Sequence, residues 1–251
     1  MIAREPDRCS VAYRVRFDEA GSDGLVRTSV LLRYTQDLAG YHSAARGFGR
    51  SWYAKRAITW VVRAAEVGVV RPIAVGAEIV GTTQVVGWRR VWARRRTEFH
   101  DAAGILLAWV HIDWVLLDAH GAPTRIPPEF DAAFGAPPAT FRLARVDLGV
   151  TPGAAVRTGF TVRPQELDPM DHVNNAVYAD WLDEALLAAG GASSVRAVPR
   201  LARLEYARAA EPAATLSAEA WPDEGAWSCR VVDPDGELLR ARLEPGSPIE
   251  V

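Results

Sequence analysis

The side chains best suited to chemistry lie together in one short polar stretch, Asp168-Pro-Met-Asp-His-Val-Asn-Asn175. It holds a carboxylate at Asp168, an imidazole at His172 and amides at Asn174 and Asn175. A carboxylate or an imidazole can take a proton from water, and a carboxylate can also attack a carbonyl carbon directly. The stretch therefore predicts a site for attack on a carbonyl group, with Asp168 and His172 as candidate catalytic residues.

A helix must follow this stretch and position it. Apolar residues recur at helical spacing beyond Asn175 and predict a helix over 175–188. Asn174 or Asn175 can cap its first turn. The first N–H groups of a helix have no partner inside the helix, and its dipole favours negative charge there. We therefore expect the backbone at Val173, Asn174 and Asn175 to stabilise an oxyanion.

Composition excludes several classes of protein. The chain has 251 residues, 49% hydrophobic and 24% charged, which is typical of a globular protein. Its formal net charge of −2 argues against nucleic-acid binding, which depends on neutralising phosphates. Cys9 and Cys229 lack the spacing of a metal site, and no apolar run is long enough to span a membrane. We expect a cytoplasmic protein that needs no metal and no organic cofactor. Its charged start argues against a secretory signal.

The same order of elements is predicted twice: a strand, a turn, a long helix and an antiparallel meander. Alternating apolar residues predict the strands, and Gly, Pro and Asp mark their turns. The helix of the first half begins near Ser29 and ends at Gly47. The predicted strands are about 10–17, 57–67, 76–88, 91–100 and 105–118, then 155–163, 200–209, 214–221, 226–233 and 237–243.

A proline-rich segment divides the two halves. Residues 121–140 suit an extended linker better than a helix or strand. We therefore divide the chain into an N-terminal unit over 1–120, this linker, and a C-terminal unit over 141–251.

The two units also match residue by residue. Placing Val15-Arg16 on Val162-Arg163 without gaps aligns Glu19 with Glu166 and Tyr34 with Trp181. Such similarity predicts a duplicated α+β unit, each with one helix packed on one face of an antiparallel sheet.

The copies differ where the chemistry would be. In this alignment Asp168 faces Gly21 and His172 faces Leu25. We therefore expect the C-terminal copy to supply the site, and the N-terminal copy to be a scaffold and pocket wall.

The pattern from Asp168 to Trp181, Asp-x-x-x-His-Val-Asn-Asn-x-x-Tyr-x-x-Trp, resembles that of the hot-dog-fold thioesterases. The chain is most similar to the acyl-acyl carrier protein thioesterases. Residues 31–40, 114–127 and 204–208 look like further segments of that family. The resemblance implies two tandem hot-dog units, each a long central helix wrapped by an antiparallel β-sheet.

The resemblance also implies an activity, the hydrolysis of fatty acyl thioesters, preferably of acyl carrier protein, to free fatty acids. It carries catalytic roles to Asp168 and His172 and requires no cofactor. Two positions depart from the plant members, which have an Asn where Met170 stands and a Glu where Ala209 stands. Simpler single-unit hot-dog thioesterases work with an acid at the Asp168 position and a helix N-terminus.

A basic run follows the second predicted strand of the meander. Its arginines form either a solvated strand face, which we favour, or a docking patch for an acidic carrier protein or the phosphates of coenzyme A. The residues of this run are Arg89, Arg90, Arg94, Arg95 and Arg96. Nearby tryptophans are expected in the core, although some could line an acyl tunnel: Trp60, Trp88, Trp92, Trp109 and Trp114.

Three other functions fit the same residues. The chain could be an acyl-CoA thioesterase with the same site, a non-catalytic acyl-binding protein, or a hot-dog dehydratase with a His/acid pair. Retention of Asp168 argues against pure binding, whereas the departures at Met170 and Ala209 argue for it. The fused layout argues against the dehydratase. A monomer and a homodimer both fit.

Overall fold

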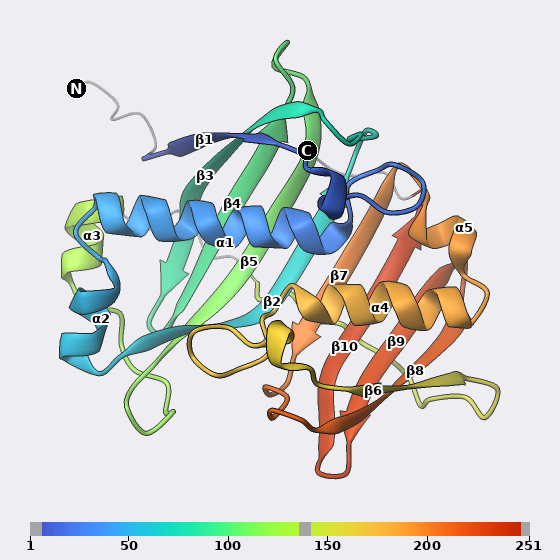
Figure 1. Cartoon of the computed structure of the whole chain (residues 1–251). Coiled ribbons are helices and arrows are strands. Elements are labelled where there is room, and N and C mark those ends of the chain that lie inside the picture. Colours follow the sequence, from blue (N-terminus) through green and yellow to red (C-terminus); the bar gives the residue numbers. More distant parts are fainter. Residues whose placement is uncertain (1–6, 136–141, 247–251) are drawn as a thin grey trace.

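The computed structural model describes residues 7–135 and 142–246. In these residues ten strands form one antiparallel sheet in the order β1-β3-β4-β5-β2-β7-β10-β9-β8-β6. Two long helices, α1 (Thr28–Ala45) and α4 (Val177–Ala188), lie on the same face of that sheet (Figure 1). α1 packs on strands of the first half and α4 on strands of the second. The core therefore lies between one layer of helices and one sheet.

All ten strands predicted from the sequence are present, with small shifts at their ends. Burial alternates along several of them, which explains why the period-two pattern identified those strands. Their bounds are β1 Cys9–Arg14, β2 Thr59–Val69, β3 Glu78–Arg89, β4 Trp92–His100, β5 Leu106–Leu117, β6 Val156–Thr161, β7 Arg200–Tyr206, β8 Thr215–Asp223, β9 Ala226–Asp233 and β10 Gly236–Pro245.

The two halves join at the middle of the sheet. β2 pairs antiparallel with β7, so that Ala65 faces Leu204 and Val67 faces Ala202. These four residues are buried in one hydrophobic core that runs through both halves. Separating the halves would expose this seam and the unpaired edges of two strands.

Three short helices were not predicted: α2 (Arg50–Arg56), α3 (Glu129–Phe134) and α5 (Ala192–Val195). α3 falls inside the segment expected to be an extended linker, so that prediction is wrong for 129–134. Residues 136–140 of the segment lie outside the described residues.

The physical reason for α3 is an aromatic contact with a distant part of the chain. Phe130 and Phe134 are one helical turn apart, and their rings lie 4.3 and 5.7 Å from the ring of Phe48. Pro128 precedes the helix, at an end where proline costs no hydrogen bond. The prolines therefore start this helix instead of preventing it.

None of the described helices combines the length and apolar character that a membrane crossing requires.

Candidate functional site

Asp168 lies in a tight turn that leads to α4. Its Oδ1 accepts hydrogen bonds from the backbone N–H groups of Met170, at 2.8 Å, and His172, at 3.5 Å. Its own N–H donates to the carbonyl of His172 at 2.8 Å. Asp171 has a φ of 61°, a left-handed conformation that lets the chain reverse here. The carboxylate is thus fixed by its own turn and remains half-buried.

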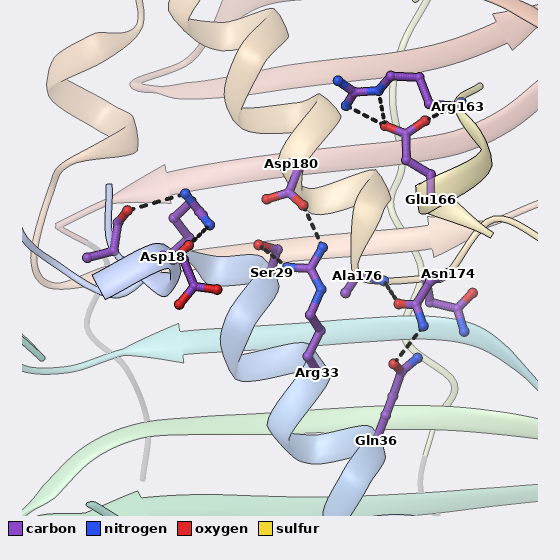
Figure 2. A network of polar contacts seen from close by, with 12 residues as sticks. Asp18, Ser29, Arg33, Gln36, Arg163, Glu166, Asn174, Ala176 and Asp180 are labelled. Atoms are coloured by element: carbon purple, nitrogen blue, oxygen red, sulfur yellow. Dashed lines mark hydrogen bonds and ion pairs between the residues drawn. The ribbon is translucent and has the colours of Figure 1, made fainter. Parts of the chain in front are cut away.

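Asn174 connects this turn to α1. Its Oδ1 accepts from the N–H of Ala176 at 2.9 Å, and its Nδ2 donates to Gln36 on α1 at 3.2 Å (Figure 2). α4 itself begins at Val177, and its N-cap, Ala176, offers no side-chain cap. The cap that the sequence predicts for an asparagine therefore lies two residues before that position, where Asn174 accepts from the turn that leads into α4.

The three backbone donors predicted for an oxyanion are not equivalent. The N–H of Asn174 donates to the carbonyl of Glu166 at 2.9 Å and is not available to a substrate. In the described part of the chain, the N–H groups of Val173 and Asn175 have no acceptor. Tyr206 donates from its hydroxyl to the carbonyl of Asn175 at 3.1 Å, which holds that residue's backbone.

A small cavity of about 80 Å³ lies beside the turn. Asp168, His172, Val173 and Asn175 line one side, and residues 60–63 of β2 line another. Among its described lining residues, Asp168 is the only one with a carboxyl group. The cavity therefore places one acid next to two unpaired backbone N–H groups.

Ala209 also lines this small cavity. The sequence resemblance placed a glutamate of the plant members at this position, so that departure falls within the site itself. His172 is exposed at the rim, and no side chain in the described residues bonds its ring. Asp168 is thus the better-held of the two predicted catalytic residues.

A second, much larger cavity of about 1130 Å³ lies over the first half of the chain. Its size is that of a small-molecule binding site. It is bordered by α1, α2, α3 and the neighbouring strands, and Pro169, Met170 and Asn174 stand at the edge nearest the turn. Aromatic rings make up much of its wall: Phe48, Tyr53, Trp60, Trp88, Trp114, Phe130 and Phe134. Three of the five tryptophans considered for an acyl tunnel therefore line this cavity.

The basic run does not form a continuous surface patch. Arg94 makes two bonds to Asp113, at 2.6 and 2.7 Å, and Arg96 pairs with Glu98 at 2.7 Å. Arg95 points inward and is buried, so the prediction of carrier docking is wrong for this residue. The alternation of a strand buries one of three adjacent arginines.

Arg89 and Arg90, at the turn between β3 and β4, are the exposed members of the run. The N–H of Ile126, which lines the large cavity, donates to the carbonyl of Arg90 at 2.8 Å. The two arginines thus lie beside the large cavity.

Comparison with known proteins decides the family. Residues 7–134 match the model of the acyl-ACP thioesterase N-terminal domain, and residues 151–211 match that of the acyl-ACP thioesterase C-terminal domain. The chain belongs to the acyl-ACP thioesterase family. It is accordingly a hydrolase of fatty acyl thioesters, as the resemblance of the Asp168 stretch predicted.

Solved structures of thioesterases share its hot-dog-type fold of helices on a large antiparallel sheet. A putative oleoyl thioesterase from Lactobacillus plantarum superposes with a TM-score of 0.87 at 20% identity, over 100% of both chains. The 12:0-ACP thioesterase from Umbellularia californica gives 0.81 at 23% identity, over 96% of this chain and 97% of that one. No curated protein sequence matches this thioesterase significantly.

Proposed function

We propose that this thioesterase cleaves acyl-ACP at the small cavity, with Asp168 as its catalytic carboxylate. One observation carries the proposal. The only carboxyl group among the described residues lining that cavity lies with two backbone N–H groups that have no acceptor in the described chain. A thioester carbonyl between them would meet a base on one side and hydrogen-bond donors on the other.

The two cavities divide the substrate between them. Trp60 and Met170 line both cavities. The thioester carbonyl lies in the small cavity, and the acyl chain passes these two side chains into the large one. Burial of the chain against aromatic rings supplies binding free energy of roughly 0.8 kcal/mol for each methylene.

Asp168 then acts as a general base. It takes a proton from water as the water oxygen attacks the carbonyl carbon. The N–H groups of Val173 and Asn175 stabilise the oxyanion, and one such donor is typically worth about 2.7–4 kcal/mol. When the C–S bond breaks, the thiolate takes a proton, and the acid and the thiol leave. Direct attack by Asp168 through an anhydride uses the same geometry.

His172 assists from the rim of the cavity. Its exposed ring can order the attacking water or pass a proton to the leaving sulfur. We therefore assign it a secondary role, beside the carboxylate that its own backbone N–H contacts at 3.5 Å.

We infer further that the chain consists of two tandem hot-dog units around the central helices α1 and α4. The strand order supports this, since β1-β3-β4-β5-β2 in the first half is repeated as β6-β8-β9-β10-β7 in the second. The order is mirrored about the β2–β7 seam. The units extend over 1–120 and 141–251.

Individual contacts repeat in the same way. The N–H of Arg16 donates to Glu19 at 2.7 Å, and the N–H of Arg163 donates to Glu166 at 2.7 Å. These residues are equivalent in the alignment of the two halves, and Figure 2 shows the second pair. Each pair closes one short 3₁₀ turn before its helix.

Carrier docking is proposed for Arg89 and Arg90 alone. They are exposed beside the acyl cavity, where an acidic carrier would deliver its chain. Cys9 and Cys229 are free thiols, which suits a reducing compartment such as the cytoplasm. A monomer and a homodimer both fit, and a measurement of molar mass by light scattering would distinguish them.

Release of free thiol from matched acyl-ACP and acyl-CoA substrates tests the function. We expect the thioesters of both carriers to be cleaved, with the higher kcat/KM for acyl-ACP. Tight binding of acyl chains without thiol release would instead identify an acyl-binding protein.

A further inference from the structure

Arg95 is a buried cation in the wall of the large cavity. It lies on β4, its exposed fraction is 6%, and it lines the cavity. Its Nη1 donates to Nδ1 of His42 at 2.8 Å and lies 3.5 Å from Oγ1 of Thr83. Within the described residues, its Nε and Nη2 have no acceptor, and no carboxylate forms an ion pair with it.

His42 does not provide the missing negative charge. Burial, and then the charge of Arg95, lower the pKa of His42 to about 4, so the ring is neutral at neutral pH. A neutral ring that accepts at Nδ1 carries its proton on Nε2, and Nε2 donates to Asp7 at 2.8 Å. Asp7 is also paired with Arg46. His42 therefore stands between the guanidinium and this carboxylate.

The guanidinium keeps its charge in this setting. Burial lowers the pKa of Arg95 to about 10, still well above neutral pH. A buried charge without a partner is strongly unfavourable, and an alkyl chain beside it would give it no acceptor. A planar guanidinium with two free donors matches a carboxylate, which it binds through two parallel hydrogen bonds.

Arg95 also lies away from the reacting end of the cavity. Gln36 of α1 bonds Asn174 of the catalytic turn, whereas His42, which bonds Arg95, is nearly two turns further along the same helix. That spacing corresponds to roughly 9 Å along the helix axis. A chain that starts at the turn thus reaches Arg95 with its remote end.

We propose that the large cavity selects acyl chains with a carboxylate at the remote end, held by the guanidinium of Arg95. The preferred substrate is then the mono-thioester of a dicarboxylic acid instead of a methyl-ended fatty acyl group. This specificity rests on the proposed function, because the chain must enter from the catalytic turn.

The test compares thioesters of equal length that end in a methyl group, a hydroxyl or a carboxylate, over a range of lengths and on one carrier. For the wild-type protein we expect kcat/KM to favour the carboxylate by about ten-fold or more at the best length. Arg95→Met should reverse that preference. Arg95→Lys, which keeps the charge but loses the fork, should give an intermediate ratio.

Arg96→Met is the matched control. It removes a cation from the next position of the same strand, where the side chain pairs with Glu98 instead of lining the cavity. Its ratio should equal that of the wild-type protein. A wild-type preference for methyl-ended chains at every length, with both rates falling alike in Arg95→Met, would overturn the proposal. So would a preference for a terminal hydroxyl over a carboxylate.

Binding is measured separately from turnover. Free dicarboxylic acids should raise the Tm of the wild-type protein more than that of Arg95→Met, and each variant's Tm without ligand shows whether it folds. If this difference appears but no thioester is cleaved, the role of Asp168 fails and the Arg95 site stands. Cleavage without any such difference refutes the Arg95 site and leaves the proposed function intact.

Discussion

Trp60 of β2 and Met170 of the Asp168 turn stand at the junction of the two cavities, since both residues line each of them. Thr59, the neighbour of Trp60, places its Oγ1 4.0 Å from Sδ of Met170. The two residues come from different halves of the chain. A substrate that uses both cavities must pass between them, so we expect this junction to control access of the acyl chain.

Narrowing the junction should penalise long chains. Met170→Trp places a larger ring at a position that is 46% exposed and can accept it without disturbing the core. We expect kcat/KM for chains that reach the large cavity to fall about ten-fold or more, because each excluded methylene loses its burial. Short acyl groups should be affected little. The measurement is kcat/KM against chain length.

Leu187→Trp is the control for this change. Leu187 lies on α4, has the same exposed fraction of 46%, and lines neither cavity. It should leave the chain-length profile unchanged. A profile that also stays flat in Met170→Trp would remove the junction from the path of the chain.

Asp168→Asn separates the chemistry from the structure of the turn. The amide oxygen can still accept from Met170 and His172, as Oδ1 does now, but it cannot take a proton. We expect kcat to fall about 10²-fold or more with an unchanged Tm. Asp171→Asn, in the same turn, is the control because asparagine tolerates its positive φ. Equal activity of the two variants would refute the role of Asp168.

Much of this architecture could be predicted because it depends on local pattern. Apolar and polar residues alternate along many of the strands, and the turns between them carry glycine. The alignment of the two halves also pairs Arg33 with Asp180. In the structure these two side chains, one on α1 and one on α4, meet at 2.8 Å (Figure 2). A contact between equivalent positions is what the proposed twofold relation between duplicated units would produce, although neither residue reveals it alone.

The rest depended on contacts between distant segments. Phe130 and Phe134 form a helix because Phe48 lies against them. The sequence around residues 129–134 does not indicate this distant contact. Arg94, Arg95 and Arg96 look alike in the sequence. Only the structure shows that Arg95 lies on the face of β4 that points inward. The contact of Tyr206 with the turn that leads to α4 was also missed, because Tyr206 and Asn175 are 31 positions apart and meet only when β7 packs beside that turn.

Tyr206→Phe should weaken the oxyanion site without removing it. The variant loses the bond to the carbonyl of Asn175, at 3.1 Å, and leaves the neighbouring N–H less well held. We expect kcat to fall about ten-fold with little change in KM. Tyr178→Phe is the matched control, since that buried hydroxyl also bonds a backbone group, the N–H of Ala210 at 2.8 Å. Equal losses of kcat in the two variants would contradict a specific role for Tyr206.

Arg89 and Arg90 should matter for the protein carrier. Arg89→Ser with Arg90→Asn removes both charges, and asparagine suits the φ of 56° at residue 90. We expect the KM for acyl-ACP to rise several-fold at low salt and to depend less on salt. The reason is that electrostatic attraction speeds docking of the carrier and salt screens that attraction. Arg71→Ser removes an exposed charge elsewhere and should not change KM. A salt-independent KM in the wild-type protein would rule out electrostatic docking.

His42 should make the protein less stable in acid. The ring is 2% exposed, and burial followed by repulsion from Arg95 lowers its pKa from 6.5 to about 4. Asp7, on the other side of the ring, opposes this shift but is itself paired with Arg46. Between pH 6.5 and 4 the unfolded chain binds a proton that the folded chain excludes. The stability from neutral His42 is therefore full above pH 6.5 and is lost as the pH falls toward 4.

The lowered pKa of His42 corresponds to at most about 3 kcal/mol of folding stability. His42→Gln can keep both contacts, because its oxygen can accept from Arg95 and its nitrogen can donate to Asp7, and it does not titrate. The free energy of unfolding in denaturant, measured from pH 7.5 to 4.5, should fall more steeply for the wild-type protein than for the variant. Parallel curves would mean that the pKa of His42 is the same in the folded and unfolded chains, with attraction by Asp7 offsetting the effects of burial and Arg95.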